Sequence, residues 1–192
     1  MTGRIIDRGA KFAGYIGLGM ALVVAIAFEL IIPVQTVVFL LCLPMGVLIG
    51  VYANVRSERW RPRSRVFANS IYAGVVTGIG IAVLYTVIRF VFLYGDTGAL
   101  PDGTSLTCRT GPDCTYQRYV ALGQTDELAS LGITDGPSFE AAAWRELIAS
   151  GTGMFALTLG GALIGAVGRS LVSAPVKTGA APVRNPPSEA VA

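Results

Sequence analysis

Two charged residues, Glu29 and Arg89, lie well inside long apolar runs of the sequence. A charged side chain at membrane depth costs about 3 kcal/mol or more, so each should meet an opposite charge or water. Glu29 lies about three residues from the end of its run and Arg89 about five from the end of its own. Three interpretations stay open: a structural ion pair between two helices, a substrate or ion site, or two side chains that reach the interface independently.

Cys108 and Cys114 are a second pair of residues that could react with each other or bind a metal. The Gly-Pro-Asp sequence between them is typical of a turn, so their sulfurs can meet and form a disulfide. A metal or redox pair is the alternative, but the sequence has no histidine and no further cysteine nearby, which makes a poor zinc site. Cys42, inside an apolar run, is predicted to be a small apolar filler. We predict no metal and no cofactor.

Catalytic motifs are missing from the sequence. There is no histidine for acid–base chemistry, no P-loop and no Gly-x-Ser-x-Gly. A metal-dependent membrane enzyme would need acids such as Asp126, Glu127 and Glu140, whose spacing does not match a site of that kind. We therefore predict that the protein is not an enzyme. A net charge of +3 without a separate basic domain also excludes nucleic acid as a partner.

The elements that position these residues are predicted to be membrane helices. The chain is 53% hydrophobic and 14% charged, whereas soluble domains carry about 25% charged residues. A fold class follows: an all-α membrane protein, built as a four-transmembrane-helix bundle. A tight hairpin near Pro33 must separate the first two spans, because one helix across both would be about twice as long as a bilayer is thick. The spans cover about residues 12–32, 37–55, 66–94 and 147–168.

A polar segment, residues 95–146, joins the third and fourth spans and is predicted to be an extracytoplasmic loop tied by the disulfide. Within it, residues 125–128 predict a short helical turn, and Ser138 is predicted to cap a helix that begins at Phe139. Residues 1–174 thus form one transmembrane domain. The Pro- and Ala-rich residues 175–192 predict a disordered cytoplasmic tail.

Positive charges give the spans a direction. Eleven Lys and Arg residues flank one side against three on the other, so the positive-inside rule places both termini in the cytoplasm. The loop carries eight acids and three arginines, a net charge of −5. A cleaved signal peptide, ending near the Ala-Ile-Ala sequence at residues 25–27, is the competing interpretation. Cleavage there would leave an odd number of spans and undo this charge balance.

Glycine pairs at a spacing of four residues recur in three of the spans. Small residues let helix backbones approach closely in lipid. All of these pairs lie toward the cytoplasmic half, which predicts a closely packed inner half and a wider, more polar outer half. Alternatively, the glycine face of one helix could form the interface of a homodimer. The pairs are Gly46 and Gly50, Gly74 and Gly78, and Gly161 and Gly165.

The inner loop between the second and third spans is rich in arginine. Beside an anionic leaflet, each such residue contributes about 1 kcal/mol of membrane attraction. We predict contact with anionic lipid, and docking of a cytoplasmic partner is the alternative. The residues are Arg56, Arg59, Arg61, Arg63 and Arg65.

The functional prediction rests on these features together. Arginine outnumbers lysine by 13 to 2, which indicates a GC-rich bacterial genome. We predict a small polytopic protein of the bacterial inner membrane, without catalysis, that is an accessory or assembly component of a membrane complex. The alternative is a subunit of an oligomeric transporter or channel with a charged outer vestibule at Glu29 and Arg89. Expected partners are membrane lipids and either a homo-oligomer or a larger membrane complex.

Overall fold

The computed structural model describes residues 6–31, 35–55, 62–101, 103–108 and 110–172. Over these residues the fold is helical, and the β-structure is confined to an isolated bridge between Ala99 and Ser105. Four helices are long and apolar enough to cross a membrane. The prediction of an all-α chain with four candidate spans is therefore confirmed.

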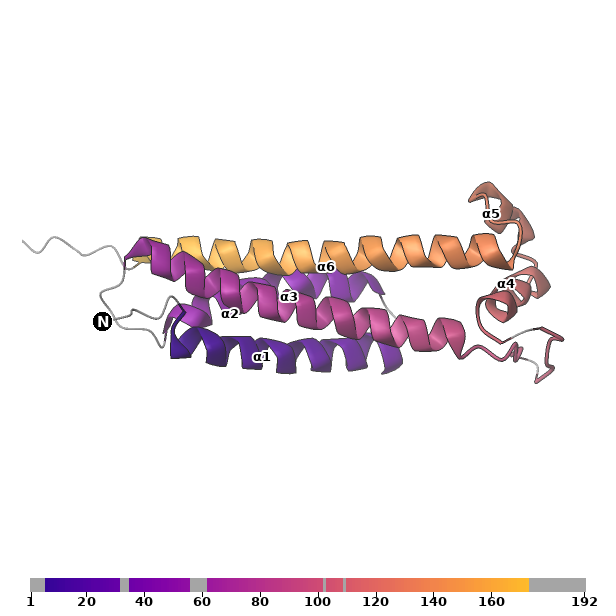
Figure 1. The fold of residues 1–192 in the computed structure, drawn as a ribbon, viewed down its shortest axis with the longest axis horizontal. Helices are drawn as coiled ribbons and strands as arrows, with labels where there is room; N and C mark the ends of the chain where they lie inside the picture. Colours follow the sequence, from indigo (N-terminus) through magenta and orange to yellow (C-terminus); the bar gives the residue numbers. More distant parts are fainter. Residues whose placement is uncertain (1–5, 32–34, 56–61, 102, 109, 173–192) are drawn as a thin grey trace, which may run out of the picture.

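The four long helices run antiparallel to one another in sequence order (Figure 1). The start of the first and the end of the last lie at the same end of the bundle. The hairpin predicted near Pro33 and the tail at residues 175–192 lie outside the described residues. The helices of the bundle are α1 (Arg8–Ala25), which continues as the π-helix η1 (Ile26–Ile31), α2 (Gln35–Val55), α3 (Arg63–Tyr94) and α6 (Gly136–Val172).

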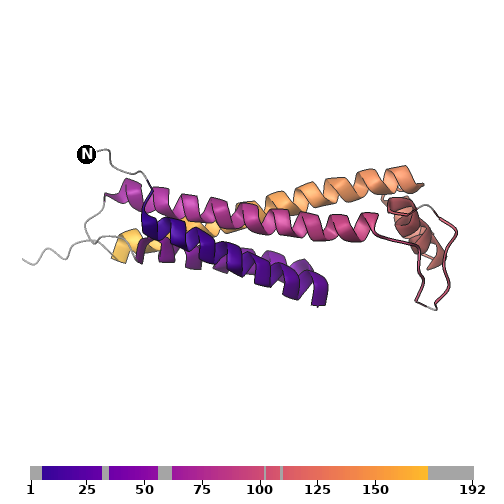
Figure 2. The same ribbon diagram turned by 60° about the horizontal axis from the view of Figure 1, so that its bottom comes forward.

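Two of the helices run past the other two at one end of the bundle (Figures 1 and 2). The 21 residues of α2 reach about 31 Å, close to one hydrocarbon core, whereas the 32 of α3 and 37 of α6 reach about 48 and 55 Å. Beyond the apolar helices, residues 95–135 fold into a cap. It contains α4 (Pro112–Ala121) and α5 (Thr125–Ser130).

The buried face of α1 is made of small residues. Large apolar side chains on the same helix, such as Leu22 and Val23, are exposed. This distribution suits lipid, which solvates large apolar side chains while small ones let helices pack closely. The buried positions are Ala10, Ala13, Gly14, Gly17, Ala21 and Ala25.

The predicted glycines form the contact between α2 and α6. A Cβ atom on Gly46 would lie 2.1 Å from the Thr158 carbonyl oxygen, and one on Gly161 would lie 2.2 Å from that of Leu43. Such distances leave room only for hydrogen, so the two backbones are in direct contact. Gly50 and Gly165 continue the same crossing, because Cβ atoms built on them would lie 2.3 and 2.5 Å from the nearest carbonyl oxygens.

The third glycine pair lies between α3 and α6. A Cβ on Gly74 would lie 2.6 Å from the Ala162 Cβ, and one on Gly78 would lie 3.0 Å from the Phe155 ring. All six glycines therefore pack against helices of the same chain. Gly17 serves the α1–α3 contact in the same way, since a Cβ there would lie 1.8 Å from the Thr77 Oγ1.

Two details of the cap differ from the sequence predictions. The Gly-Pro-Asp sequence does not form a free turn: Gly111, with φ +99°, is the N-cap of α4, and Pro112 is its first residue. Proline suits this place because the first helical N–H has no partner to lose. Ser138 was also predicted wrongly as the N-cap of the last helix, because α6 begins at Gly136 and the capping residue is Asp135.

Asp135 and Ser138 cap the start of α6 reciprocally. The Ser138 N–H donates to the Asp135 Oδ1 at 2.8 Å, and the Asp135 N–H donates to the Ser138 Oγ at 3.0 Å. Ser138 thus takes part in the cap as predicted, but at the third helical position and not at the N-cap itself. A serine at the third helical position satisfies the N-cap amide, much as glutamate does in a capping box.

Candidate functional site

Glu29 and Arg89 lie in contact between the first and third long helices. The Arg89 Nε is 2.9 Å from the Glu29 Oε2. The two side chains are unequally buried, with 2% of Glu29 exposed and 37% of Arg89. The guanidinium also lies over the Tyr85 ring, with its Cζ 5.5 Å from the ring centroid. The pair thus crosslinks η1 to α3 inside the bundle.

The π-helix η1 places Glu29 on the buried face. Four-residue steps link Gly17, Ala21, Ala25 and Glu29 along this face. In an α-helix each such step drifts by about 40° around the axis. A π-turn holds more residues than an α-turn, so η1 reduces the drift and keeps Glu29 pointing toward α3. The π-helix was not predicted, although the four-residue spacing of small residues toward Glu29 indicates its buried face.

A cleft above this pair is lined by two arginines. It lies among α3, α4 and α6 and has a volume of about 200 Å³. Arg89 reaches it from α3, Arg118 from α4 and Glu146 from α6. The walls are mostly apolar and aromatic: Tyr85, Phe92, Leu93, Tyr119, Phe139 and Leu147. Binding sites for small molecules are typically lined by apolar and aromatic side chains with a few polar groups that fix the orientation of the ligand, and the lining of this cleft is of that kind.

Asp96 is the centre of the cap. Its side chain is 5% exposed and forms an ion pair with Arg118. It also accepts hydrogen bonds from the Thr115 hydroxyl at 2.9 Å and from the Gly98 N–H at 2.9 Å. Asp96 follows directly on α3, so these bonds fasten α4 to the end of that helix. This pair was not predicted, because both residues lie in a polar loop in which many acids and arginines are available to pair.

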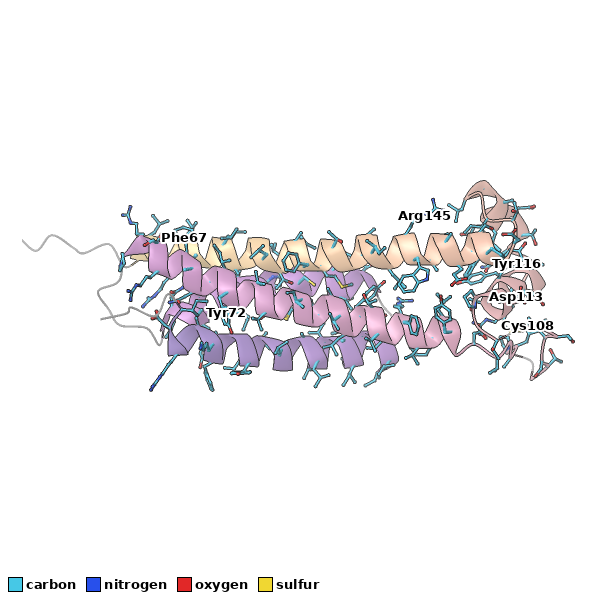
Figure 3. All side chains as sticks on the ribbon, viewed as in Figure 1. Phe67, Tyr72, Cys108, Asp113, Tyr116 and Arg145 are labelled. Atoms are coloured by element: carbon cyan, nitrogen blue, oxygen red, sulfur yellow. A yellow bond between two sulfur atoms is a disulfide. The ribbon has the colours of Figure 1, made fainter. Side chains whose placement is uncertain are left out.

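Cys108 and Cys114 form the predicted disulfide, which lies in the cap. It ties the segment before α4 to the first turn of that helix, with the two Cα atoms 5.2 Å apart. Figure 3 shows Cys108, Asp113 and Tyr116 together at this end, whereas Tyr72 lies toward the opposite end of α3. Cys42 is a buried free thiol in α2.

An aromatic group joins the projecting ends of α3 and α6. The Trp144 Nε1 donates to the Tyr94 hydroxyl at 3.1 Å, and that hydroxyl donates to Glu140. The Phe90 ring lies 4.4 Å from Tyr94 and 6.0 Å from Trp144, centroid to centroid. These contacts hold the projecting ends of the two helices together.

The end of the bundle opposite the cap holds a polar network that the sequence analysis missed. The Asn69 Nδ2 donates to the Asp7 carboxylate at 2.6 Å, and the Asp7 N–H donates to the Asn69 Oδ1 at 3.2 Å. Asn54 donates to the Ser70 hydroxyl at 2.8 Å, and Ser70 donates to the Gly50 carbonyl oxygen at 2.9 Å. The signal was present, because amide side chains inside apolar runs require buried partners.

The basic loop falls mostly outside the described residues. Arg56, Arg59 and Arg61 lie there, whereas Arg63 and Arg65 are exposed on the first turn of α3. Lipid contact by this loop stays a prediction.

A second cavity lies on the outer side of the cap, among α4, α5 and α6. Its volume is about 510 Å³. Leu128, Leu131, Ile133 and Phe139 line it together with charged residues, Glu127 among them. In the part of the chain that the structure describes, no group of three or more His, Cys, Asp or Glu side chains could hold a metal ion.

No protein-family model matches the chain, and no curated protein or solved structure is significantly similar to it.

Proposed function

We propose that this chain is a polytopic protein of the bacterial inner membrane that acts without catalysis, as an accessory or assembly component of a membrane complex. The observation that carries this proposal is the cap. It stands on α3 and α6 beyond the ends of α1 and α2 (Figure 1). A disulfide and the Asp96–Arg118 ion pair hold it in place, and Tyr116 and Tyr119 of α4 pack against Phe139 of α6.

The apolar helices support the same role. Their deepest charges pair with each other, and α2 and α6 pack backbone to backbone. A close-packed bundle is suited to carrying a rigid surface at one face of the membrane. With both termini in the cytoplasm, that face is the extracytoplasmic one.

Site-directed photo-crosslinking in native membranes tests the proposal. A photoreactive residue at Leu131, which is 70% exposed in the cap, should give one discrete product larger than the chain itself. The matched control is Leu171, which is 71% exposed near the opposite end of α6 and should give no such product. A cap that crosslinks to nothing, while the control does, would overturn the proposal.

The transporter or channel subunit remains the second candidate. It is favoured by Arg89, which lines the cleft next to the cap. It is disfavoured by the near-complete burial of Glu29, since a transport site needs water around its charges. Reconstitution in liposomes separates the two functions. Ion or solute flux that Arg89→Gln abolishes would establish transport, whereas the accessory role predicts no flux in either protein.

A further inference from the structure

The cleft between α3, α4 and α6 presents charges of both signs to one small volume. Arg89 and Arg118 line it, while their carboxylate partners, Glu29 and Asp96, do not. Each partner is buried, with 2% of the Glu29 side chain and 5% of the Asp96 side chain exposed. A guanidinium has five N–H donors in a planar fork, so it can hold a carboxylate at one edge and meet a second acceptor elsewhere.

The net charge of this site determines which ligand suits it. Glu29 neutralises Arg89 and Asp96 neutralises Arg118, so Glu146 leaves the site with a formal charge of −1. A simple anion gains little from such a site. A zwitterion gains binding energy from the positive and the negative groups of the site, because its anionic oxygens can face the two guanidiniums while its cation faces the exposed Glu146 carboxylate.

The depth of the cleft points to the membrane surface. The first long helix ends at Ile31, two residues after Glu29, while α3 continues five residues past Arg89 to Tyr94. The cleft therefore begins beside the last turn of η1 and extends toward the cap, a depth that corresponds to lipid headgroups. Its volume of about 200 Å³ is below the roughly 300 Å³ at which pockets for drug-sized ligands begin.

We propose that this cleft binds a phosphoethanolamine group. The phosphate oxygens accept hydrogen bonds from Arg89 and Arg118, and the primary ammonium donates to Glu146. The apolar walls, Phe92 and Leu93 among them, accommodate the carbon chain that joins the group to its carrier. The carrier is either a phospholipid of the surrounding leaflet or a soluble molecule. Binding here does not depend on whether the protein assists a larger complex.

Native mass spectrometry of the full chain, delipidated in detergent, tests the proposal. The probes are phosphatidylethanolamine, phosphatidylcholine and phosphatidylglycerol with identical acyl chains. Phosphatidylethanolamine should bind about tenfold more tightly than the other two, because a trimethylated amine has no N–H to donate and a glycerol headgroup has no cation. Equal affinity for the ethanolamine and choline lipids would overturn the proposal.

Two variants test the assigned residues separately. Glu146→Gln should reduce the affinity for phosphatidylethanolamine about tenfold, to that for phosphatidylcholine. Arg118→Lys keeps the positive charge that Asp96 requires but loses the planar set of guanidinium donors. It should therefore lower the affinities for phosphatidylethanolamine and phosphatidylcholine alike and leave the ratio of the two affinities unchanged. Arg145→Gln is the matched control, since Arg145 is the exposed neighbour of Glu146 and does not line the cleft. A tenfold preference that survives Glu146→Gln would contradict the assignment.

Competition with free phosphoethanolamine identifies the carrier. If millimolar phosphoethanolamine displaces the lipid, the headgroup alone supplies the affinity and a soluble ligand is supported. If the lipid binds and is not displaced, the phospholipid is the ligand. Both results support the shared chemistry, whereas displacement by inorganic phosphate at the same concentration would overturn the role of the ammonium group.

Discussion

At the residue scale, the unequal burial of Glu29 and Arg89 decides what their contact does. Glu29 is 2% exposed and its Oε1 has no hydrogen-bond partner among the described residues. Arg89 is 37% exposed, stacks on Tyr85 and reaches the cleft. The buried carboxylate therefore depends on the arginine to compensate its negative charge, whereas the arginine retains access to the membrane interface.

This asymmetry predicts unequal effects of removing each partner. Arg89→Gln should lower the free energy of unfolding by about 3 kcal/mol, because it leaves a buried carboxylate unpaired. Glu29→Gln should lower it by about 1 kcal/mol, because Arg89 can turn toward the interface. Unfolding of both variants by SDS titration in mixed micelles measures the difference.

The double variant provides the control for this prediction. It should recover part of the loss caused by Arg89→Gln alone, since no buried charge then remains. A coupling energy near zero would show that the two groups do not stabilise each other, and a larger loss from Glu29→Gln would show that the burial argument is wrong.

The cap formed by Asp135 at the start of α6 is expected to depend on pH. Hydrogen bonds from the Ser138 side chain and backbone hold the pKa of this exposed carboxyl below its ordinary value of 3.8. The carboxylate form is the one that the folded chain stabilises. Its contribution is therefore complete above the ordinary pKa and is lost as pH falls through the lowered one.

NMR titration of the Asp135 carboxyl carbon checks this. The midpoint should lie below 3.8 in the native chain and return toward it in Ser138→Ala, which removes the side-chain hydrogen bond. Ser130→Ala, in the exposed last turn of α5, serves as the control and should leave the midpoint unchanged. An unshifted midpoint in the native chain would exclude the reciprocal cap.

At the scale of helices, the contact between α2 and α6 depends on the absence of side chains. Gly46 and Gly161 each place hydrogen where a Cβ would lie about 2 Å from a backbone carbonyl oxygen of the other helix. Backbone atoms cannot avoid a clash by rotating to another conformer, as side chains can. The helices must therefore separate if either glycine gains a methyl group.

Two neighbouring glycines of α6 make this testable. Gly161→Ala should destabilise the bundle by about 1–3 kcal/mol, the usual cost of overpacking. Gly160→Ala is the matched control, because a Cβ there meets nothing within 4 Å. It should leave stability unchanged or raise it by up to about 1 kcal/mol through helix propensity. Thermal unfolding in detergent measures both, and equal effects at the two positions would disprove the close crossing.

At the scale of the whole molecule, the cap lies opposite the end where α1 begins and α6 ends (Figure 2). This arrangement matches the charge pattern, in which eleven positive charges flank one side of the spans and three the other. The cap is therefore expected outside the cytoplasm, where its disulfide persists.

Cysteine labelling in intact cells tests this topology. In a Cys42→Ala background, a membrane-impermeant reagent should label Ser130→Cys in the cap without cell lysis. It should label Ser57→Cys and Ser188→Cys only after lysis. Labelling of positions 130 and 188 on the same side would rule out four spans.

Features that depend on neighbouring residues could be predicted from the sequence. Length and hydropathy predicted the four apolar helices, because the cost of placing backbone and side chains in lipid is paid along each segment separately. A separation of six residues sufficed for the Cys108–Cys114 disulfide. The same local reasoning failed at Pro112 and Ser138, where turn and helix-start signals use the same residue types.

Contacts between groups far apart in the chain became visible only in the folded protein. Glu29 and Arg89 are 60 positions apart, and their contact depends on where α1 and α3 cross and on the π-turns of η1. Asp96 and Arg118 pair because α4 folds back on the end of α3. The cleft forms because α3 and α6 continue past α1 and α2. Each of these depends on helix crossings, which arise from packing between surfaces far apart in the chain. A local pattern such as a glycine pair marks a contact face but does not identify the helix that packs on it.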